Sequence, residues 1–291
     1  MEYWSIGVMG RARNLGISPQ KNAKGAKVRA QQSGVDKVGW LKRQAMEAFR
    51  NEEEMQQRRE QIVVDNNAMN LVINQPDSNR PLPAVILIQH QEGVDPFMEE
   101  MTERAGGAGF FAVTLDLYHR DGPDCKDDGP TRRGRARDTN IIKDVDATVN
   151  YLKANKFVDG SRIGILGFCM GGRVAYLMAA SNRELKAAVA WYPGSCFRQW
   201  GESPTPFERT AQIGCPLQGH FGETDGNPTL QDKDKIAAKL NKFGKAHEFH
   251  VYKGAGHAFM DRHHVEKYHA QADQESWPRA MEFLKKHLAV Q

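Results

Sequence analysis

The feature that most constrains the fold is an apolar strand that turns at once into a helix, over residues 162–180. Its corner reads GFCMGG, with Cys169 in the middle and glycines at 167 and 171. So tight a corner strains the backbone of the middle residue, and the glycines leave room because they have no Cβ. We therefore expect Cys169 to stand at the N-terminus of a helix, at the carboxyl end of a strand.

A cysteine in this position is suited to nucleophilic chemistry. The dipole of the following helix favours a thiolate, and the backbone N–H of Met170 points the same way and can stabilise an oxyanion. The alternative is that the turn serves only packing and that Cys169 is a small buried hydrophobe, as free cysteines often are. Partners in the right order downstream favour the first interpretation.

An acid and a base follow two later strands. Asp225 comes after the strand expected to end at residue 221, and His257 lies in a glycine-flanked loop after the strand expected to end at residue 252. The chain order of nucleophile, acid and histidine is the one that the α/β-hydrolase topology produces. His257 would take the Cys169 proton, and Asp225 would orient the ring. Glu223 is the nearest alternative acid.

Strand and helix patterns alternate along most of the chain, which predicts an α/β-hydrolase fold with a mostly parallel central sheet and helices on both faces. A hairpin over residues 61–74 would lead into it. Further strands are expected at 84–89, 110–115, 162–168, 186–191, 216–221 and 248–252, and helices at 96–105, 139–155, 170–180, 229–243 and 276–288. Residues 61–291 would form this domain, with a long polar loop up to residue 137.

Residues 1–60 are expected to be a separate basic extension. Residues 1–36 are rich in arginine and lysine and have only two acids, Glu2 and Asp36, which suggests a flexible tail, and residues 38–60 have a helical pattern. No secretory signal core or membrane-spanning run is present in the sequence, so a cytoplasmic location is expected, with organelle import through the basic N-terminus left open.

Composition limits the classes of partner. The net charge of +4 is spread along the chain without a nucleic-acid-binding motif, which argues against nucleic acid as a partner. The four cysteines have neither zinc-site nor disulfide-framework spacing. We expect no metal, no organic cofactor and no membrane contact, and a monomer or homodimer that binds a small molecule.

The sequence from about residue 61 to the end resembles the dienelactone hydrolase family, whose members are similar to carboxymethylenebutenolidase. The resemblance rests on GFCMGG at Cys169, GETDG at Asp225, GAGHAF at His257 and DLYHR at residues 116–120. It implies an α/β-hydrolase fold, a cysteine nucleophile and a triad of Cys169, Asp225 and His257. It also implies that Arg120 contacts a substrate carboxylate.

Two positions depart from the family pattern. The family has Gln-Glu after the strand at 84–89, with the glutamate near the resting thiol, whereas here His90 follows Gln89 and Glu92 lies two residues later. The family's second carboxylate-binding arginine falls where this chain has Asp261, with Arg262 next to it. We therefore include His90, Glu92 and Arg262 among the expected substrate-binding residues.

Two roles are possible for Tyr192 and for the arginines of one polar segment. Tyr192 is expected to line the substrate pocket, although aromatic residues there serve equally well as core. The arginines of TRRGRARD, residues 131–138, are expected to be a solvated loop face rather than an anion site.

The expected reaction is hydrolysis of a lactone or ester through an acyl-thioester on Cys169. The N–H of Met170 and a second N–H from His90 or Gln91, with Gln91 as the first choice, would hold the oxyanion. Enol lactones, thioesters and aryl esters should react, because a thiolate is expelled more readily than an alkyl alkoxide. The alternatives are a general carboxylesterase or thioesterase without lactone preference, and a non-catalytic, thiol-sensing binding protein.

Overall fold

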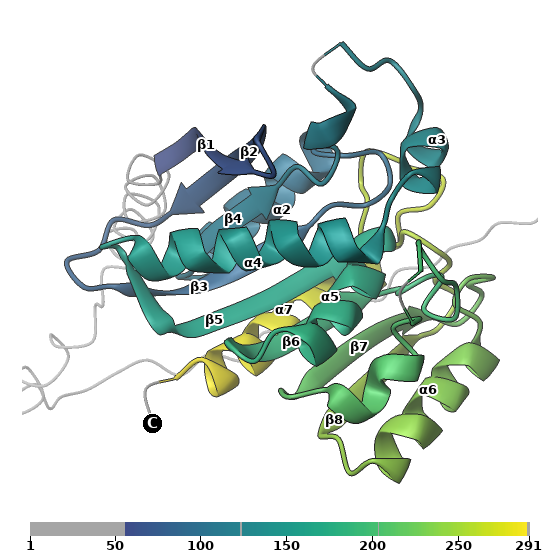
Figure 1. Ribbon diagram of the computed structural model, residues 1–291. Helices are drawn as coiled ribbons and strands as arrows, with labels where there is room; N and C mark the ends of the chain where they lie inside the picture. Colours follow the sequence, from purple (N-terminus) through teal and green to yellow (C-terminus); the bar gives the residue numbers. More distant parts are fainter. Residues whose placement is uncertain (1–55, 123, 203, 290–291) are drawn as a thin grey trace, which may run out of the picture. The chain divides into compact units, whose positions relative to one another are not determined.

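The computed structural model describes residues 56–122, 124–202 and 204–289 (Figure 1). The expected tail of residues 1–36 and the expected helix up to residue 55 lie outside these ranges. Residues 56–60, expected to end that helix, instead belong to the first strand, so this part of the prediction is wrong. Within the described ranges no helix is long and apolar enough to cross a membrane.

One sheet of eight strands runs through the described part of the chain, in the order β1-β2-β4-β3-β5-β6-β7-β8. The pairs β1–β2 and β2–β4 are antiparallel, and every other neighbouring pair is parallel. The strands are β1 (Gln56–Val64), β2 (Asn67–Gln75), β3 (Leu82–Ile88), β4 (Phe111–Leu115), β5 (Val158–Phe168), β6 (Leu185–Trp191), β7 (Leu217–Gly222) and β8 (His247–Tyr252). The prediction of a mostly parallel sheet is confirmed.

Helices cover both faces of this sheet. They are α2 (Pro96–Gly107), α3 (Gly129–Gly134), α4 (Asp138–Ala154), α5 (Met170–Ser181), α6 (Leu230–Lys242) and α7 (Ala270–His287), with short 3₁₀ turns η1 (His119–Asp121) and η2 (Glu208–Gln212). Helices α4, α5 and α6 lie on the near face in Figure 1, and α2 and α7 lie behind the sheet.

The central strands are apolar without interruption because both of their faces are buried. In β3, Ala84, Ile86 and Ile88 face the core beneath α4 and α5, and Val85 and Leu87 face the core beneath α2 and α7. This alternation is the two-residue period of an extended strand. A continuous apolar run thus fills two cores at once.

The register of the parallel strands brings their carboxyl ends to one edge of the sheet. Ile88 of β3 pairs with Gly167 of β5, and Phe168 pairs with Trp191 of β6. At the far side, Gly222 of β7 pairs with Tyr252 of β8. Loops that follow these strands therefore meet at a common edge, where ligands bind in open α/β sheets.

Helix boundaries differ from the predictions in two places. The polar segment expected to be a loop contains the six-residue helix α3, capped by Asp128, whose side chain accepts the N–H of Thr131. The last helix begins at Ala270 rather than at residue 276, with the His269 side chain accepting the N–H of Ala272. Both starts depend on side-chain caps, which the apolar pattern does not reveal.

Candidate active site

Cys169 lies at the corner between β5 and α5 with φ 54° and ψ −112°. This backbone conformation is rare for a residue with a side chain, and it is the strained corner that the glycine pattern predicts. A Cβ on Gly167 would lie 2.1 Å from the carbonyl oxygen of Gly171, and one on Gly171 would lie 2.1 Å from that of Ile88. Glycine at 167 and 171 is therefore a steric requirement of the turn.

His257 and Asp225 form a hydrogen-bonded pair on loops after neighbouring strands. The His257 Nδ1 lies 2.9 Å from Oδ2 of Asp225, which is buried. The other Asp225 oxygen accepts the backbone N–H of Asn227 at 2.8 Å, which fixes the carboxylate. With Nδ1 bonded to the carboxylate, Nε2 of His257 is left to face other groups.

The surroundings of His257 favour its charged form. Burial lowers its pKa, but hydrogen bonds to Asp225 and to Cys169 outweigh that effect and raise the pKa to about 10. An imidazolium between a carboxylate and a sulfur atom is the arrangement expected of an activated cysteine nucleophile. The ring of Tyr192 packs on His257 at 5.1 Å between centroids.

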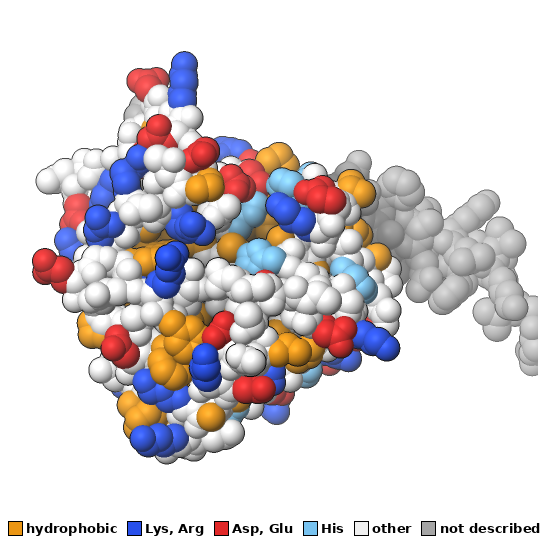
Figure 2. Space-filling view, turned by 90° about the vertical axis from the view of Figure 1, so that its right-hand side faces the viewer, with side chains coloured by type: hydrophobic (Ala, Val, Ile, Leu, Met, Phe, Trp, Pro, Cys, Tyr) orange, Lys and Arg blue, Asp and Glu red, His pale blue; other side chains and the backbone are white. Residues whose placement is uncertain are grey.

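These residues share one cavity of about 410 Å³ at the carboxyl edge of the sheet. Its walls comprise Cys169, Asp225, His257, His90, Gln91, Glu92 and Tyr192, all named above as candidate site residues, together with Arg133, Gly226, Asn227, Ala258, Asp261, His264 and Lys267. Figure 2 shows this side of the molecule, with histidine side chains among acidic and basic ones. The cavity is of the size that holds a small ligand.

His90 belongs to a second histidine–aspartate pair at the same cavity. Its Nε2 lies 2.9 Å from Oδ2 of Asp95, whose other oxygen caps α2 by accepting the N–H of Met98. Burial would raise the pKa of Asp95, but the contacts with His90 and the cap keep it below its ordinary value. The His90 ring also packs on Phe97 at 5.2 Å, so the side chain is held on several sides.

The two expected oxyanion donors lie on different elements. Met170 is the first residue of α5, so its N–H cannot have a partner within that helix. Gln91 follows β3 and lines the cavity. The carbonyls of Ile88 and Gln89 abut Gly171, which brings the end of β3 against the first turn of α5.

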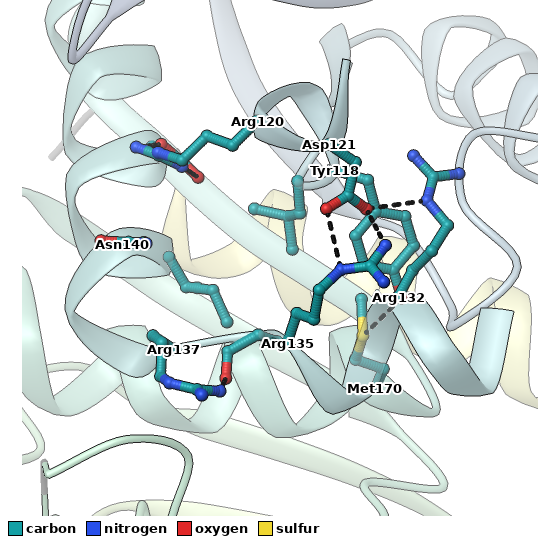
Figure 3. Close-up of a pocket in the computed structure, with 12 residues that line it drawn as sticks. Tyr118, Arg120, Asp121, Arg132, Arg135, Arg137, Asn140 and Met170 are labelled. Carbon is teal, nitrogen blue, oxygen red and sulfur yellow. Dashed lines mark hydrogen bonds and ion pairs between the residues drawn. The ribbon is translucent and has the colours of Figure 1, made fainter. Parts of the chain in front are cut away.

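The structure does not bring Arg120 or Arg262 to this cavity. Arg120 donates to both oxygens of buried Asp144 at 2.7 Å and also pairs with Asp65, beside a second cavity of about 60 Å³ that Figure 3 shows. Arg262 lies 3.0 Å from Glu100 and 3.2 Å from Asp273. The prediction that these two arginines hold a substrate carboxylate is therefore not retained, because both are already paired with carboxylates elsewhere.

Four charged or titratable residues of the cavity, Arg133, Asp261, His264 and Lys267, are not among the site residues expected from the sequence. Arg133 belongs to the arginine-rich segment that was expected to be a solvated face, yet it lines the cavity and donates to the Gln91 side chain at 2.9 Å. Lys267 and His264 lie in the polar segment after His257, and His264 is bonded to Asp261 at 2.7 Å. Their sequence context contains no pattern that identifies them as site residues.

Glu223, the alternative acid, and two other histidines of the chain have other partners. Glu223 accepts the backbone N–H of Gly254 at 2.8 Å. His250 stacks on His220, and His263 lies 3.1 Å from Glu100. In the part of the chain that the structure describes, no group of three or more His, Cys, Asp or Glu side chains is arranged to hold a metal ion.

The sequence matches the dienelactone hydrolase family over residues 69–288. A protein of Escherichia coli K12 with the provisional name carboxymethylenebutenolidase is 32% identical over 216 residues, which make up 72% of this chain and 79% of that protein. A relative from Methylorubrum extorquens with the same provisional name is 29% identical over 222 residues, 73% of this chain and 75% of its own length.

Solved structures agree with this match. The crystal structure of a Klebsiella pneumoniae protein, provisionally named dienelactone hydrolase, superposes with a TM-score of 0.75 at 27% identity and covers 80% of this chain and 99% of that one. The fold is thus the α/β-hydrolase fold, as predicted. The chain belongs to the dienelactone hydrolase family and is a hydrolase.

Proposed function

We propose that this protein hydrolyses lactones and activated esters through a covalent thioester on Cys169. The observation that carries the proposal is the strained placement of Cys169 beside a charged His257–Asp225 pair, at the wall of one cavity. A residue is held in such a conformation only where the surrounding structure enforces it, and such strain is concentrated at functional sites. The names of the relatives, which refer to lactone hydrolysis, support the same reaction class.

The first half of the reaction forms the thioester. The Cys169 sulfur attacks the carbonyl carbon, and the carbonyl electrons move to oxygen, where the N–H groups of Met170 and Gln91 would hold the charge. Collapse of this intermediate breaks the bond to the leaving oxygen, which takes a proton from His257. For a lactone the leaving oxygen stays attached to the acyl chain.

The second half releases the acid. Once the sulfur is acylated, His257 has given up its proton and can accept one from a water molecule, whose oxygen attacks the thioester carbonyl. The thiolate then leaves as the carbon–sulfur bond breaks, and the resting pair is restored. Asp225 keeps the His257 ring in one orientation through both halves.

Cations at the cavity wall favour a substrate with a carboxylate. Among the described residues, neither Arg133 nor Lys267 has a carboxylate within ion-pair distance, although both line the cavity. An arginine whose fork is not occupied by an acidic side chain can form paired hydrogen bonds to a carboxylate. We assign to Arg133 and Lys267 the substrate-binding role that was expected of Arg120 and Arg262.

Hydrolysis of dienelactone and of p-nitrophenyl acetate by the purified protein tests the proposal, with Cys169→Ala and Cys125→Ala as a matched pair. Cys125 is also a free, partly exposed cysteine but lies outside the cavity. We expect activity in the wild type and in Cys125→Ala, and a loss of about 1,000-fold or more in Cys169→Ala. Cleavage of the aryl ester alone would favour a general esterase.

Two further outcomes separate the alternatives. Cys169→Ser should shift the preference from aryl towards alkyl esters, because an alkoxide and a serine oxygen are comparable leaving groups. Absence of turnover on both substrates, with reversible oxidation of Cys169, would favour the thiol-sensing binding protein. Activity that survives in Cys169→Ala would contradict the cysteine mechanism.

A further inference from the structure

Tyr118 is a buried residue that connects the two segments of the proposed oxyanion hole. It follows β4, and its N–H donates to Asp116 Oδ1 at 2.9 Å, which fixes the turn. The side chain is 5% exposed and runs beneath the cavity wall towards the start of α5. Nothing in the reaction described above uses it.

The Tyr118 hydroxyl contacts both residues whose N–H groups would hold the oxyanion. It donates to the backbone carbonyl of Gln91 at 2.9 Å, and its oxygen lies 3.4 Å from the Sδ of Met170. Gln91 and Met170 are far apart in sequence and belong to different elements. A single hydroxyl therefore links the loop after β3 to the first residue of α5.

The Gln91 backbone is held on both sides of its Cα. The carbonyl of His90, which belongs to the same peptide group as the Gln91 N–H, accepts the N–H of Gly93 at 3.2 Å. Because N–H and C=O point in opposite directions in a trans peptide, this bond sets the direction of the Gln91 N–H. The bond from Tyr118 fixes the next peptide group.

The ring of Tyr118 is itself held in place. The Arg132 guanidinium lies 4.3 Å from the ring centre, and its Nε donates to Asp121 at 3.1 Å. Figure 3 shows the ring between Arg132 and Met170. Helix α3 packs on the same loop, since a Cβ on Gly129 would lie 2.6 Å from the Gln91 carbonyl.

We propose that Tyr118 is a positioning residue that holds Gln91 and Met170 in register, so that their two N–H groups converge on one oxyanion. The inference rests on the proposed function. An oxyanion hole stabilises the transition state only when its donors are oriented before the reaction, so a small displacement of one donor costs rate rather than substrate affinity. Loss of the hydroxyl should therefore lower kcat and leave KM nearly unchanged.

The test compares Tyr118→Phe with Tyr176→Phe. Tyr176 is equally buried and its hydroxyl lies 2.7 Å from Thr210, so both variants lose one buried hydroxyl bond, but Tyr176 has no contact with the oxyanion donors. For each protein we would measure kcat and KM on p-nitrophenyl acetate and the rate of Cys169 alkylation by iodoacetamide. Alkylation needs the nucleophile but no oxyanion hole.

We expect kcat to fall about 10- to 100-fold in Tyr118→Phe, with KM and the alkylation rate close to those of the wild type and with Tyr176→Phe unaffected. Equal kcat values for the two variants would overturn the inference, and so would an equal fall in alkylation, which would place the effect on the thiol. If the wild type itself cleaves no ester, the proposed function fails first. Should Tyr118→Phe not fold, Met170→Leu keeps the side-chain volume but removes the sulfur contact, and it should lower kcat several-fold without slowing alkylation.

Discussion

The two cavities at the carboxyl edge of the sheet use their arginines differently. In the smaller cavity, of about 60 Å³, three of the four arginines, Arg120, Arg132 and Arg135, are each paired with a carboxylate of the protein, and Arg137 donates to the backbone carbonyls of Gly134 and Ala136. In the larger one, of about 410 Å³, Arg133 and Lys267 have no such partner among the described residues. A cation that is neutralised by its own chain serves stability, and one that is not is available to a ligand. Changes to the charged residues of the larger cavity should therefore alter the chemistry, and changes to Arg120 or Arg135 in the smaller one should alter stability.

The largest effect is expected from Asp225→Asn in the larger cavity. Without the carboxylate, the His257 ring loses both its orientation and its charge stabilisation, so kcat should fall about 1,000-fold or more. Glu223→Gln is the matched control, because Glu223 bonds the N–H of Gly254 instead of His257. Steady-state kinetics on an aryl ester measures both. Equal losses in the two variants would mean that the chemistry does not depend on the His257–Asp225 pair.

The next effect belongs to the smaller cavity and concerns stability. Arg120→Ala leaves the Asp144 carboxylate buried, with His119 at 3.2 Å as its remaining partner, and should lower the free energy of unfolding by about 3 kcal/mol. Lys153→Ala removes an exposed pair with Glu184 and should hardly change the free energy of unfolding, because solvent screens an exposed ion pair. Urea unfolding measures both. A change in kcat per folded molecule in Arg120→Ala would show that the two cavities do not differ as described.

A smaller effect is expected from Arg133→Ala. The KM for an aryl ester that carries a carboxylate on its acyl chain should rise about tenfold, the value of one charged hydrogen bond, while the KM for p-nitrophenyl acetate should hardly change. Arg135→Ala is the control, since Arg135 lies in the same segment but pairs with Asp121 and Asp127. If both variants raise KM by the same factor, the arginines act only through the summed positive charge of the segment and not through direct contact with the substrate.

A further expected effect is a pH dependence of stability that comes from His257. Its pKa is raised from 6.5 to about 10 in the folded protein, so its contribution is fully present below pH 6.5 and is lost as pH rises through about 10. Asp225→Asn removes one cause of the raised pKa. The difference in free energy of unfolding between wild type and Asp225→Asn should therefore shrink from pH 6.5 to 10. A difference that stays constant over this range would contradict the raised pKa.

The sequence predicted the sheet because its signals are local. Continuous apolar strands, alternating helices and the glycines around Cys169 each act within a few residues, and they place the loops of Asp225 and His257 at one edge. The first strand was partly missed because residues 56–60 are charged and polar and are extended by pairing with β2, not by an apolar pattern. Helix α3 was missed because it is short and begins at a side-chain cap.

The direction of the arginines could not be predicted in this way. The Arg120 side chain bonds to the carboxylates of Asp144 and Asp65. Asp144 lies in a helix and Asp65 in a turn, and both are distant from Arg120 in sequence. Arg133 reaches the cavity because the segment that carries it packs on the loop of Gln91. The direction of a long, flexible arginine side chain depends on where the carboxylates around it lie, and those positions are determined by the tertiary structure. Motifs therefore identify where the chemistry lies better than they identify what binds there.

The most direct test of the central claim is the mass of the intact protein during the first turnover of p-nitrophenyl acetate, followed by peptide mapping of the adduct. We predict an increase by one acetyl group, located on Cys169 and removed by neutral hydroxylamine, as expected of a thioester. An acetyl group found on another residue while turnover is undiminished would contradict the cysteine mechanism. Turnover by the Cys169→Ala variant without any adduct would contradict it as well.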